Sequence, residues 1–379
     1  MASLMSRNFS HKRPRSTRTG RPVPAGSRHL RRRRRPGRLH SKSVTFATSK
    51  DVADNAVKSN SDRFYLNLTG FPFPLAPLFE RETIRYEVEP DRIWTFEQPQ
   101  GFEVTTTNVR MTVIKLESGG LWVHAPIAPT KECVRLIQEL NAPVEHIILA
   151  TYAYEHKIFV GPFSRKFPEA KVYVAPKQWS WPINLPLQFF GIFPQGVLKD
   201  MDSEVPWADE IEQKLFTPPP VGLGSIVECA FFHKSTGTLL LTDAVVCVGE
   251  MAPDVVPVEN LLDQADDAEF LPDSKPSKKG VRPPDSPEAR RKGWMRNVLR
   301  VLYVKSSDLL NPEQSFEAVV GKLIVSPIIR PLYFGHTPEI PKIAYFGPQP
   351  KPYFGLILWD LFLHQIKSIV LSQHNIYCI

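Results

Sequence analysis

Cysteines and long apolar runs are scarce in this sequence, and each scarcity excludes a class of protein. The four cysteines, Cys133, Cys229, Cys247 and Cys378, lie far apart without a C-x-x-C pair. This spacing supports neither a disulfide framework nor a zinc ribbon. No apolar run reaches the ~18 residues that a membrane-spanning helix requires. We therefore expect a protein that is soluble or at most attached to a membrane surface.

Acidic residues are absent from the first 50 positions, which carry 12 Arg, 3 Lys and 12 Ser or Thr. This composition is typical of an organellar transit peptide, and the apolar core of a secretory signal is missing. We expect residues 1–50 to be disordered and to direct the protein to the chloroplast. The alternatives are a mitochondrial peptide and a nuclear-import or RNA-binding run at Arg31–Arg35.

The basic excess of the whole chain, a net charge of +8, comes from this leader alone. Removing its 15 basic residues from the total of 47 leaves 32 against 39 acidic residues, so the remainder is near −7. A duplex-binding protein needs a cationic surface on its folded part, because phosphate neutralisation supplies most of its affinity. We expect no nucleic-acid partner.

The first half of the body alternates strands and helices. The 37 prolines predict many loops, and residues 51–80 read as a linker. "NVRMTVIKL" and "LWVHAPI" predict a hairpin that turns at Gly119 and Gly120. Thr130 is placed to cap a helix, "VEHIILA" and "KVYVAP" predict buried strands, and a short helix is expected around Phe163–Phe167. This order is typical of the α/β class.

The second half predicts a hairpin, a mobile insertion and a helix. The hairpin turns at Ser235–Gly237, and its return strand ends at Asp243. Residues 251–287 are rich in Pro, Asp and Lys without periodicity, which predicts a mobile insertion. A helix is expected from Ser286 to about Val304, with an apolar face that includes Trp294 and basic residues around it. Packing against the domain and contact with an anionic membrane both fit this pattern.

The order of these segments resembles the opening of a metallo-β-lactamase-like domain: a hairpin, "HAPIAPT" leading into a helix, a buried strand and a polar loop. In that family the loop carries H-x-H-x-D-H, and the matching positions here are Tyr152, Tyr154, His156 and Lys157. Pro220 stands where "FTPPPVGLGS" matches the family's next histidine, and Asp243 matches its metal-bridging aspartate. The resemblance implies a four-layer αββα sandwich over residues 81–338.

Longer phrases are similar to an uncharacterised family of plant and algal plastid proteins with a degenerate form of this fold. They include "YEHKIFVGPFSRKFP", "QWSWPINLP", "PWADEIEQK" and "RRKGWMRNVL". That family implies the fold and the compartment, and it brings no established reaction. The resemblance ends after Pro338, so residues 339–379 are predicted to be a divergent tail that leaves the fold incomplete at its C-terminal end.

The residues at the matched positions do not suit a pair of zinc ions. Zinc takes nitrogen, thiolate or carboxylate ligands, and a tyrosine must first lose a proton with a pKa of ~10. Lys157 adds a positive charge that repels a divalent cation. We expect no cofactor beyond at most one metal ion, with His156 and Asp243 as its ligands. Glu155 and His233 complete the candidate set.

Local spacing gives a geometric expectation for this loop. Tyr152, Tyr154 and His156 are at i, i+2 and i+4, so an extended loop would turn them to one side and Glu155 to another. Structural interpretations remain open: His156 as a hydrogen-bonded loop histidine, Asp243 as a turn cap, and Trp179 and Trp181 as packing residues.

Three functions follow from these residues. The first is a binding or regulatory protein for a small ligand or a protein partner, without zinc hydrolysis. The second is a hydrolase or oxidoreductase with a single metal, such as iron, to which a tyrosinate contributes. The third is a peripheral membrane protein that contacts lipid through residues 287–304. The sequence favours the first.

Overall fold

The computed structural model describes part of the chain, all of it within the compact unit Ser49–Ile379. The described residues are 61–66, 75–102, 105–179, 184–217, 227–267, 282–301, 312–317, 320 and 323–325. The predicted transit peptide at 1–50, the tail at 339–379, Trp181 and Pro220 lie outside the described residues. The domain boundaries therefore stay predictions.

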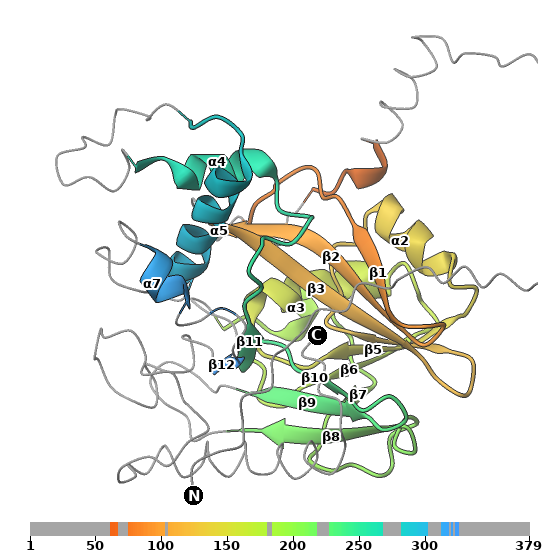
Figure 1. Cartoon of the computed structure of the whole chain (residues 1–379). Helices are drawn as coiled ribbons and strands as arrows, with labels where there is room; N and C mark the ends of the chain where they lie inside the picture. Colours follow the sequence, from red (N-terminus) through yellow and green to blue (C-terminus); the bar gives the residue numbers. More distant parts are fainter. Residues whose placement is uncertain are drawn as a thin grey trace, which may run out of the picture. The chain divides into compact units, whose positions relative to one another are not determined.

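The larger sheet contains seven strands in the order in which they occur along the chain (Figure 1). They are β1 (Ile84–Glu89), β2 (Ile93–Phe102), β3 (Thr105–Lys115), β4 (Leu121–His124), β5 (Val144–Leu149), β6 (Lys171–Val174) and β7 (Gly196–Val197). Strands β1 to β4 pair antiparallel, and β4 to β7 pair parallel. Gly119 turns between β3 and β4 at a φ of 91°, which only glycine adopts readily. The predicted hairpin is confirmed.

Helices α2 (Lys131–Gln138) and α3 (Tyr154–Ser164) pack on the larger sheet. Thr130 caps α2, because its hydroxyl oxygen accepts a hydrogen bond from the backbone N–H of Cys133 at 3.0 Å. The core between helices and sheet includes the buried side chains of Phe96, Met111, Ile137, Ile147, Phe159 and Phe163. The predicted capped helix is confirmed.

A smaller sheet packs against the larger one. It is formed by β8 (Ile211–Phe216), β9 (Glu228–His233) and β10 (Thr238–Leu240) in the order β10-β9-β8. Aromatic rings fill the space between the two sheets: the ring centroids of Trp122 and Phe231 are 4.9 Å apart in an edge-on arrangement. The predicted second hairpin is confirmed in β9 and β10, but its return strand ends at Leu240 and not at Asp243.

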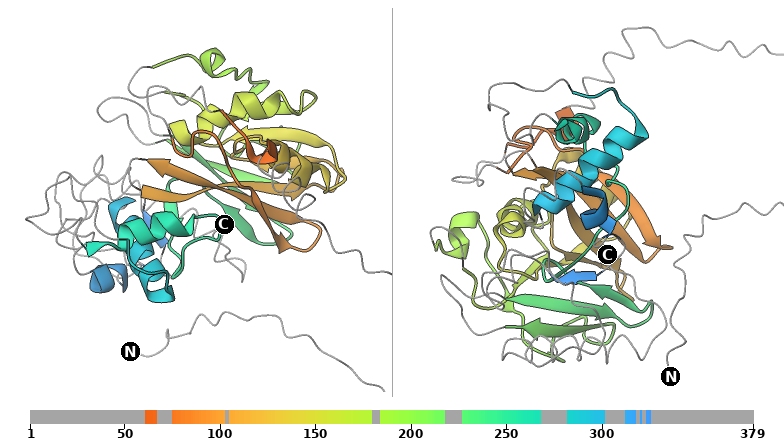
Figure 2. Two further views of the ribbon diagram at one scale, coloured as in Figure 1. Left: turned by 90° about the horizontal axis from the view of Figure 1, so that it is seen from above. Right: turned by 60° about the vertical axis from the view of Figure 1, so that its left-hand side comes forward.

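A second group of helices lies on the opposite side of the strands from α2 and α3 (Figure 2). It contains α4 (Val258–Ala265), α5 (Pro287–Val301) and α7 (Pro312–Glu317), with the short strands β11 (Val245–Cys247) and β12 (Leu323–Val325) beside it. Sheet on sheet with helices on both outer sides is the αββα arrangement. The fold class expected from the sequence is confirmed.

Helix α4 corrects the expectation of an irregular insertion over residues 251–287. Its residues Leu261 and Leu262 are 4% and 6% exposed, and Leu261 packs against Trp294 of α5. Gly293 permits this close approach, because a Cβ at that position would lie 1.8 Å from the carbonyl oxygen of Leu261. The helix depends on a tertiary contact, which the local composition does not reveal.

Helix α5 is a packed element of the domain. Ser286 caps it by accepting a hydrogen bond from the backbone N–H of Ala289 at 3.1 Å. Its apolar residues Trp294, Met295, Val298 and Leu299 are buried. Its basic residues pair within the chain: Arg290 with Asp285, Lys292 with Asp267, and Arg291 with Glu313 and Glu317. These contacts favour the packing interpretation over membrane contact through residues 287–304.

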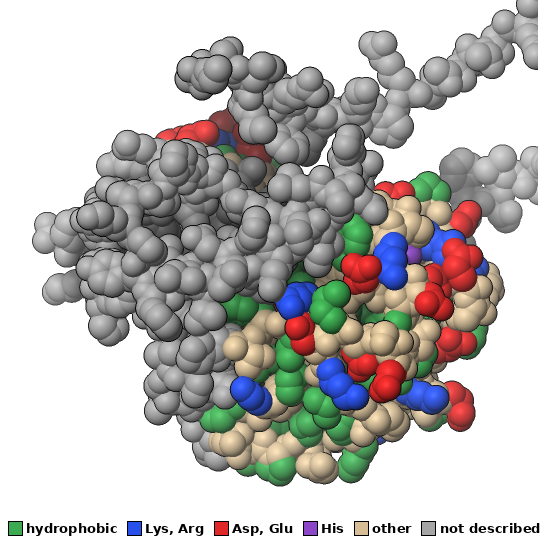
Figure 3. Space-filling model, turned by 90° about the horizontal axis from the view of Figure 1, so that it is seen from below, with side chains coloured by type: hydrophobic (Ala, Val, Ile, Leu, Met, Phe, Trp, Pro, Cys, Tyr) green, Lys and Arg blue, Asp and Glu red, His purple; other side chains and the backbone are tan. Residues whose placement is uncertain are grey.

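The surface carries charges of both signs. On the face drawn in Figure 3, Asp and Glu lie among Lys and Arg, so the described part of this face is not a continuous cationic surface. Among the described residues, no helix is both long and apolar enough to cross a membrane.

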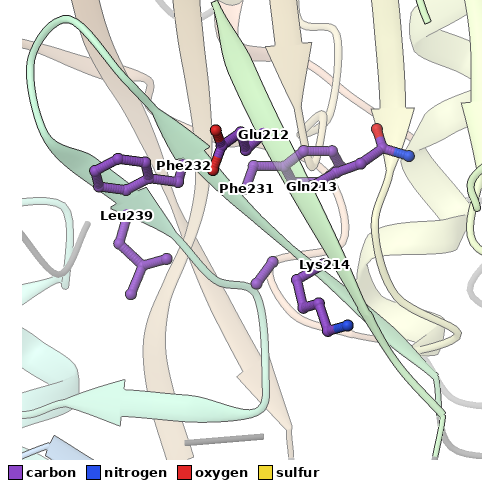
Figure 4. A pocket seen from close by; sticks show the side chains of 7 residues that line it. Glu212, Gln213, Lys214, Phe231, Phe232 and Leu239 are labelled. Carbon is purple, nitrogen blue, oxygen red and sulfur yellow. The ribbon is translucent and has the colours of Figure 1, made fainter. Parts of the chain in front are cut away.

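A depression in the smaller sheet is too small to hold a ligand. Its lining residues are Glu212, Gln213, Lys214, Ala230, Phe231, Phe232 and Leu239 (Figure 4). Its volume of ≈ 10 Å³ does not exceed the ~10–15 Å³ that one water molecule needs.

Candidate functional site

Polar residues from both sheets meet at the end of β5. Thr151 follows β5 and forms an antiparallel bridge with Glu228, the first residue of β9. The backbone N–H of Tyr152 donates to the carbonyl oxygen of Val227 at 3.3 Å, and the N–H of Cys229 donates to Ala150 at 2.8 Å. These bonds fix the end of one sheet against the start of a strand in the other.

His156 and Asp243 form the centre of this region. The Nε2 atom of His156 lies 3.2 Å from Oδ1 of Asp243, and the His156 side chain is almost fully buried. The Thr151 hydroxyl donates to the other Asp243 oxygen, Oδ2, at 3.0 Å. Both carboxylate oxygens of Asp243 therefore have partners from the protein.

Glu228 is a second buried carboxylate, with 1% of its surface exposed. Its Oε1 accepts a hydrogen bond from the backbone N–H of Thr242 at 2.6 Å. Its Oε2 accepts from the N–H groups of Asp243 at 2.9 Å and Ala244 at 2.6 Å. Glu228 thus shapes the turn that carries Asp243.

His124, the last residue of β4, completes the group. Its Nε2 lies 3.4 Å from the hydroxyl oxygen of Thr242, and its ring stacks on Trp122 with an interplanar angle of 9°. We call His124, Thr151, His156, Glu228 and Asp243 the acid–histidine cluster. Sequence reasoning missed Glu228 and His124, although an acidic residue in the apolar strand "ECAFFH" was a usable signal.

Electrostatics within the acid–histidine cluster shift the pKa values of the two histidines in opposite directions. Burial lowers the pKa of His156, but the charge and hydrogen bond of Asp243 outweigh burial and raise this pKa to about 9. Burial opposes ionisation of Asp243, yet the charge of His156 keeps the Asp243 pKa below its ordinary value. Burial, followed by the nearby charge of His156, lowers the pKa of His124 to about 3. At neutral pH, His156 is a cation paired with Asp243, while His124 is neutral.

Two groups at the edge of the cluster also have shifted pKa values. Burial and the charge of Asp243 raise the pKa of Glu228 above its ordinary value, while its three N–H donors favour the carboxylate form. Burial, together with the charges of Asp243 and Glu155, raises the pKa of the half-buried Tyr152 above its ordinary value of 10.0. Tyr152 therefore stays a neutral phenol at neutral pH.

The structure separates the predicted residues into two groups. Tyr152 and Glu155 lie close enough to Asp243 for their pKa values to respond to its charge, so they belong beside His156 and Asp243. Tyr154 and Lys157 contact Phe190 instead: the Tyr154 and Phe190 centroids are 6.2 Å apart, and Lys157 Nζ lies 5.9 Å from the Phe190 ring.

Helix α3 explains this division and corrects the extended-loop expectation. It begins at Tyr154, well before the segment around Phe163–Phe167 where a helix was predicted. Residues two apart on a helix point in different directions, so Tyr154 and His156 do not share a side. Glu155 lies close enough to Asp243 and His156 for its pKa to respond to their charges.

His233 lies outside the acid–histidine cluster. It ends β9, five residues after Glu228, so the strand separates the two by roughly 16 Å. Its Nδ1 lies 2.8 Å from the hydroxyl of Thr236 in the hairpin turn, and the side chain is fully buried. The structure therefore gives His233 a structural position.

The donor set of the cluster does not fit a zinc pair. Among the residues that the structure describes, no group of three or more His, Cys, Asp or Glu side chains is arranged to hold a metal ion. A structural or catalytic zinc takes at least three protein ligands. His156 and Asp243 are two. Nε2 of His124 contacts the Thr242 hydroxyl, Glu228 already accepts three backbone N–H donors, and Tyr152 is a neutral phenol.

Unmet hydrogen-bonding capacity remains around the cluster. The Nδ1 atom of His156 and the Oε1 atom of Gln178 are buried without a hydrogen-bond partner. Gln178 is held beside the cluster because its Nε2 donates to the carbonyl oxygen of Thr151 at 3.0 Å. Ala125 and Lys177, which adjoin His124 and Gln178, have φ values of 51° and 50°. Such strained non-glycine conformations concentrate at functional sites.

Comparisons with known proteins give a family and several similar structures. A family model described as a domain of unknown function (DUF4336) matches residues 90–314. No curated protein matches the chain. A metallo-beta-lactamase from Pontibacter korlensis is similar in structure, with 8% identity and a TM-score of 0.33 over 58% of this chain and 86% of that one.

Two further solved structures are similar at the same level. The Flv1 flavodiiron core from Synechocystis sp. has 15% identity and a TM-score of 0.32, over 43% of this chain and 42% of that one. The metallo-beta-lactamase FIM-1 from Pseudomonas aeruginosa in its mono-zinc form has 12% identity and a TM-score of 0.31, over 57% and 82%.

Proposed function

The chain belongs to the DUF4336 family, whose model matches more than half of its residues, and on this premise we propose that it is a binding or regulatory protein. It keeps a metallo-β-lactamase-like fold but does not hydrolyse substrates through zinc. The cluster at the strand ends binds a small polar ligand or a polar group of a protein partner.

One observation carries the proposal: the carboxylate oxygens of the cluster already have partners from the protein. Asp243 contacts His156 and Thr151, and Glu228 contacts three backbone N–H groups. Two buried carboxylates in this state stabilise a turn and an imidazolium. Recruiting them as metal ligands would break these hydrogen bonds.

The two unpartnered atoms support a binding role. Nδ1 of His156 and Oε1 of Gln178 are buried, and a buried polar atom without a partner is costly. A ligand with both a hydrogen-bond donor and an acceptor would satisfy them. The half-buried Tyr152 adds a neutral phenol beside the same cluster.

The single-metal alternative is less well supported. It requires His156 and Asp243 as ligands together with a tyrosinate. Burial and neighbouring carboxylates raise the pKa of Tyr152, which opposes tyrosinate formation. Tyr154 turns toward Phe190 and does not supply a second phenolate at the cluster.

Hydrolysis assays test the proposal. The purified full chain is incubated with ester and thioester substrates in the presence of added zinc, alongside His156→Ala and the control His233→Ala. We expect no zinc-dependent turnover above background in any of the three proteins. Turnover by the wild type that His156→Ala abolishes and His233→Ala retains would overturn the proposal.

We place this function in the chloroplast. The support is the composition of residues 1–50, which carry 15 basic residues and no acidic ones. Import of the full chain into isolated chloroplasts, followed by removal of an N-terminal segment of about this length, is the expected outcome. Import into mitochondria alone would contradict this location.

A further inference from the structure

An exposed aromatic surface follows the short helix η2 (Leu187–Phe190) on the way to the edge strand β7. Phe189 and Phe193 are 59% and 64% exposed, and Val197 is 51% exposed. The residues between them alternate: Phe190 and Ile192 are buried in the main core. Large apolar side chains with this degree of exposure, gathered in one short segment, mark interaction surfaces.

Close packing holds these exposed rings in place. The segment meets α3 at Gly161, where an added Cβ would lie 2.0 Å from the carbonyl oxygen of Phe190. Tyr154 and Lys157, which lie on the same face of α3 as Gly161, contact the Phe190 ring. Two of the four residues that depart from the expected metal ligands thus support this segment. The ring centroids of the buried Phe190 and the exposed Phe189 are in turn 5.5 Å apart.

The unpaired charges near the aromatic surface are mostly cationic, because the acids that follow Val197 are paired: Asp200 with Lys214, and Asp202 and Glu204 with Lys199. The sequence has no charged residue between Lys177 and Lys199. Arg165, Lys166, Lys171 and Lys177 are exposed nearby in the chain, against the single acid Glu169 in the stretch from Arg165 to Lys177. The Arg165 guanidinium lies beside Gly191, because a Cβ on Gly191 would be 2.7 Å from it.

These cations differ from those of α5 in being unpaired. Among the residues that the structure describes, none of Arg165, Lys166, Lys171 and Lys177 forms an ion pair, whereas Arg290, Arg291 and Lys292 all do. Unpaired cations beside exposed aromatic rings complement a surface that is apolar below and anionic at its boundary. A lipid bilayer with anionic headgroups has this structure.

We propose that the surface formed by Phe189, Phe193 and Val197, with Arg165 beside it and the exposed Lys166 and Lys177 in adjoining parts of the chain, docks the protein on an anionic lipid bilayer. The rings enter the boundary between headgroups and acyl chains, and the cations contact lipid phosphates. Phenylalanine rings need no matching pocket in a fluid partner, which favours lipid over a folded acidic protein. None of these surface residues belongs to the acid–histidine cluster, so the proposal does not depend on the proposed ligand site.

The test uses the full chain and vesicles of phosphatidylcholine, either alone or mixed in equal parts with phosphatidylglycerol. Residues 1–50 carry 15 basic residues and will bind anionic vesicles by themselves. Hydrogen exchange of residues 187–199 is therefore followed directly, and flotation is repeated in about 0.5 M salt, which screens the leader. We expect slower exchange in 187–199 with the anionic vesicles.

Variants separate the contributions. Phe189→Ser combined with Phe193→Ser is compared with Phe64→Ser combined with Phe79→Ser, because Phe64 and Phe79 are 56% and 57% exposed. We expect the first pair to lower binding in high salt about tenfold, since ~1.4 kcal/mol corresponds to a factor of ten. The control pair should leave vesicle binding in high salt unchanged.

A charge variant completes the set. Lys166→Glu should weaken binding at low salt more than Lys131→Glu, which changes an exposed lysine on α2. Circular dichroism verifies that every variant is folded. Unchanged exchange in 187–199, or equal binding by the two phenylalanine pairs, would overturn the proposal. Protection by polyglutamate but not by vesicles would also overturn it and would indicate an acidic protein partner.

Discussion

Replacing Glu228 with alanine should destabilise the protein more than any exposed charge substitution. The side chain is 1% exposed and accepts backbone hydrogen bonds from Thr242, Asp243 and Ala244 at 2.6, 2.9 and 2.6 Å. Alanine leaves these three N–H groups without a partner. Each unsatisfied buried donor costs about 1–3 kcal/mol.

The expected loss of unfolding free energy lies at the lower end of the sum of these three penalties. Glu228 and Asp243 repel each other, and this repulsion disappears in the variant. Water can also reach part of the vacated space. We expect Glu228→Ala to lower the free energy of unfolding by about 3–5 kcal/mol, and Glu228→Gln, which keeps one acceptor oxygen, by about 1–3 kcal/mol.

Urea unfolding followed by tryptophan fluorescence measures these differences. Glu212→Ala is the matched control, because Glu212 lies in the neighbouring strand β8 with a 40% exposed side chain. A surface change of this kind should stay within about 0.5 kcal/mol. A loss below about 1 kcal/mol for Glu228→Ala would refute the role of this carboxylate in holding the turn.

The remaining predictions concern the ion pair and the aromatic segment. The His156 pKa is raised from 6.5 to about 9, so its contribution is fully present below pH 6.5 and is lost as the pH rises through about 9. The Asp243 pKa is lowered, so its contribution is present above 3.8 and is lost as the pH falls. The stability difference between wild type and His156→Gln should therefore shrink in urea titrations from pH 6 to above pH 9, and a constant difference would contradict the pair. Gly161→Ala should lower the free energy of unfolding by about 2 kcal/mol or more, because the new Cβ would meet the backbone of Phe190. It should also speed hydrogen exchange at residues 187–193. Unchanged exchange there would contradict the close packing.

Local chemistry explains what the sequence predicted well. Thr130 caps its helix through one nearby N–H, and Gly119 supplies the turn conformation that the first hairpin needs. Both signals act within a few residues. The strand of "VEHIILA" is buried along almost its whole length in a parallel part of the sheet. The strand of "KVYVAP" buries Val172 and Val174, while Lys171 is exposed.

The sequence predicts helix α3 later in the chain than the structure has it, because the local signals for its start are weak. Ala153 provides no side-chain cap, and Pro162 lies inside the helix. Residues from His156 to Gly161 are all buried, so no amphipathic period is visible. The same error placed Tyr154 on the same side as His156.

The acid–histidine cluster depended on contacts that sequence distance conceals. His156 and Asp243 were identified as a possible pair through the family resemblance, and the structure places them 3.2 Å apart. Glu228 and His124 join them only because β9 begins where β4 ends. Residues from four segments meet there, and no local pattern connects them.

The zinc content of the purified full chain, expressed with added zinc, tests the central claim most directly. In the described part of the chain, no third His, Cys, Asp or Glu is arranged with His156 and Asp243 to hold a metal ion. We predict well under one zinc per chain at this site, with the same content in His156→Ala and in the control His233→Ala. One or two tightly held zinc ions per chain that are lost in His156→Ala and retained in His233→Ala would contradict it.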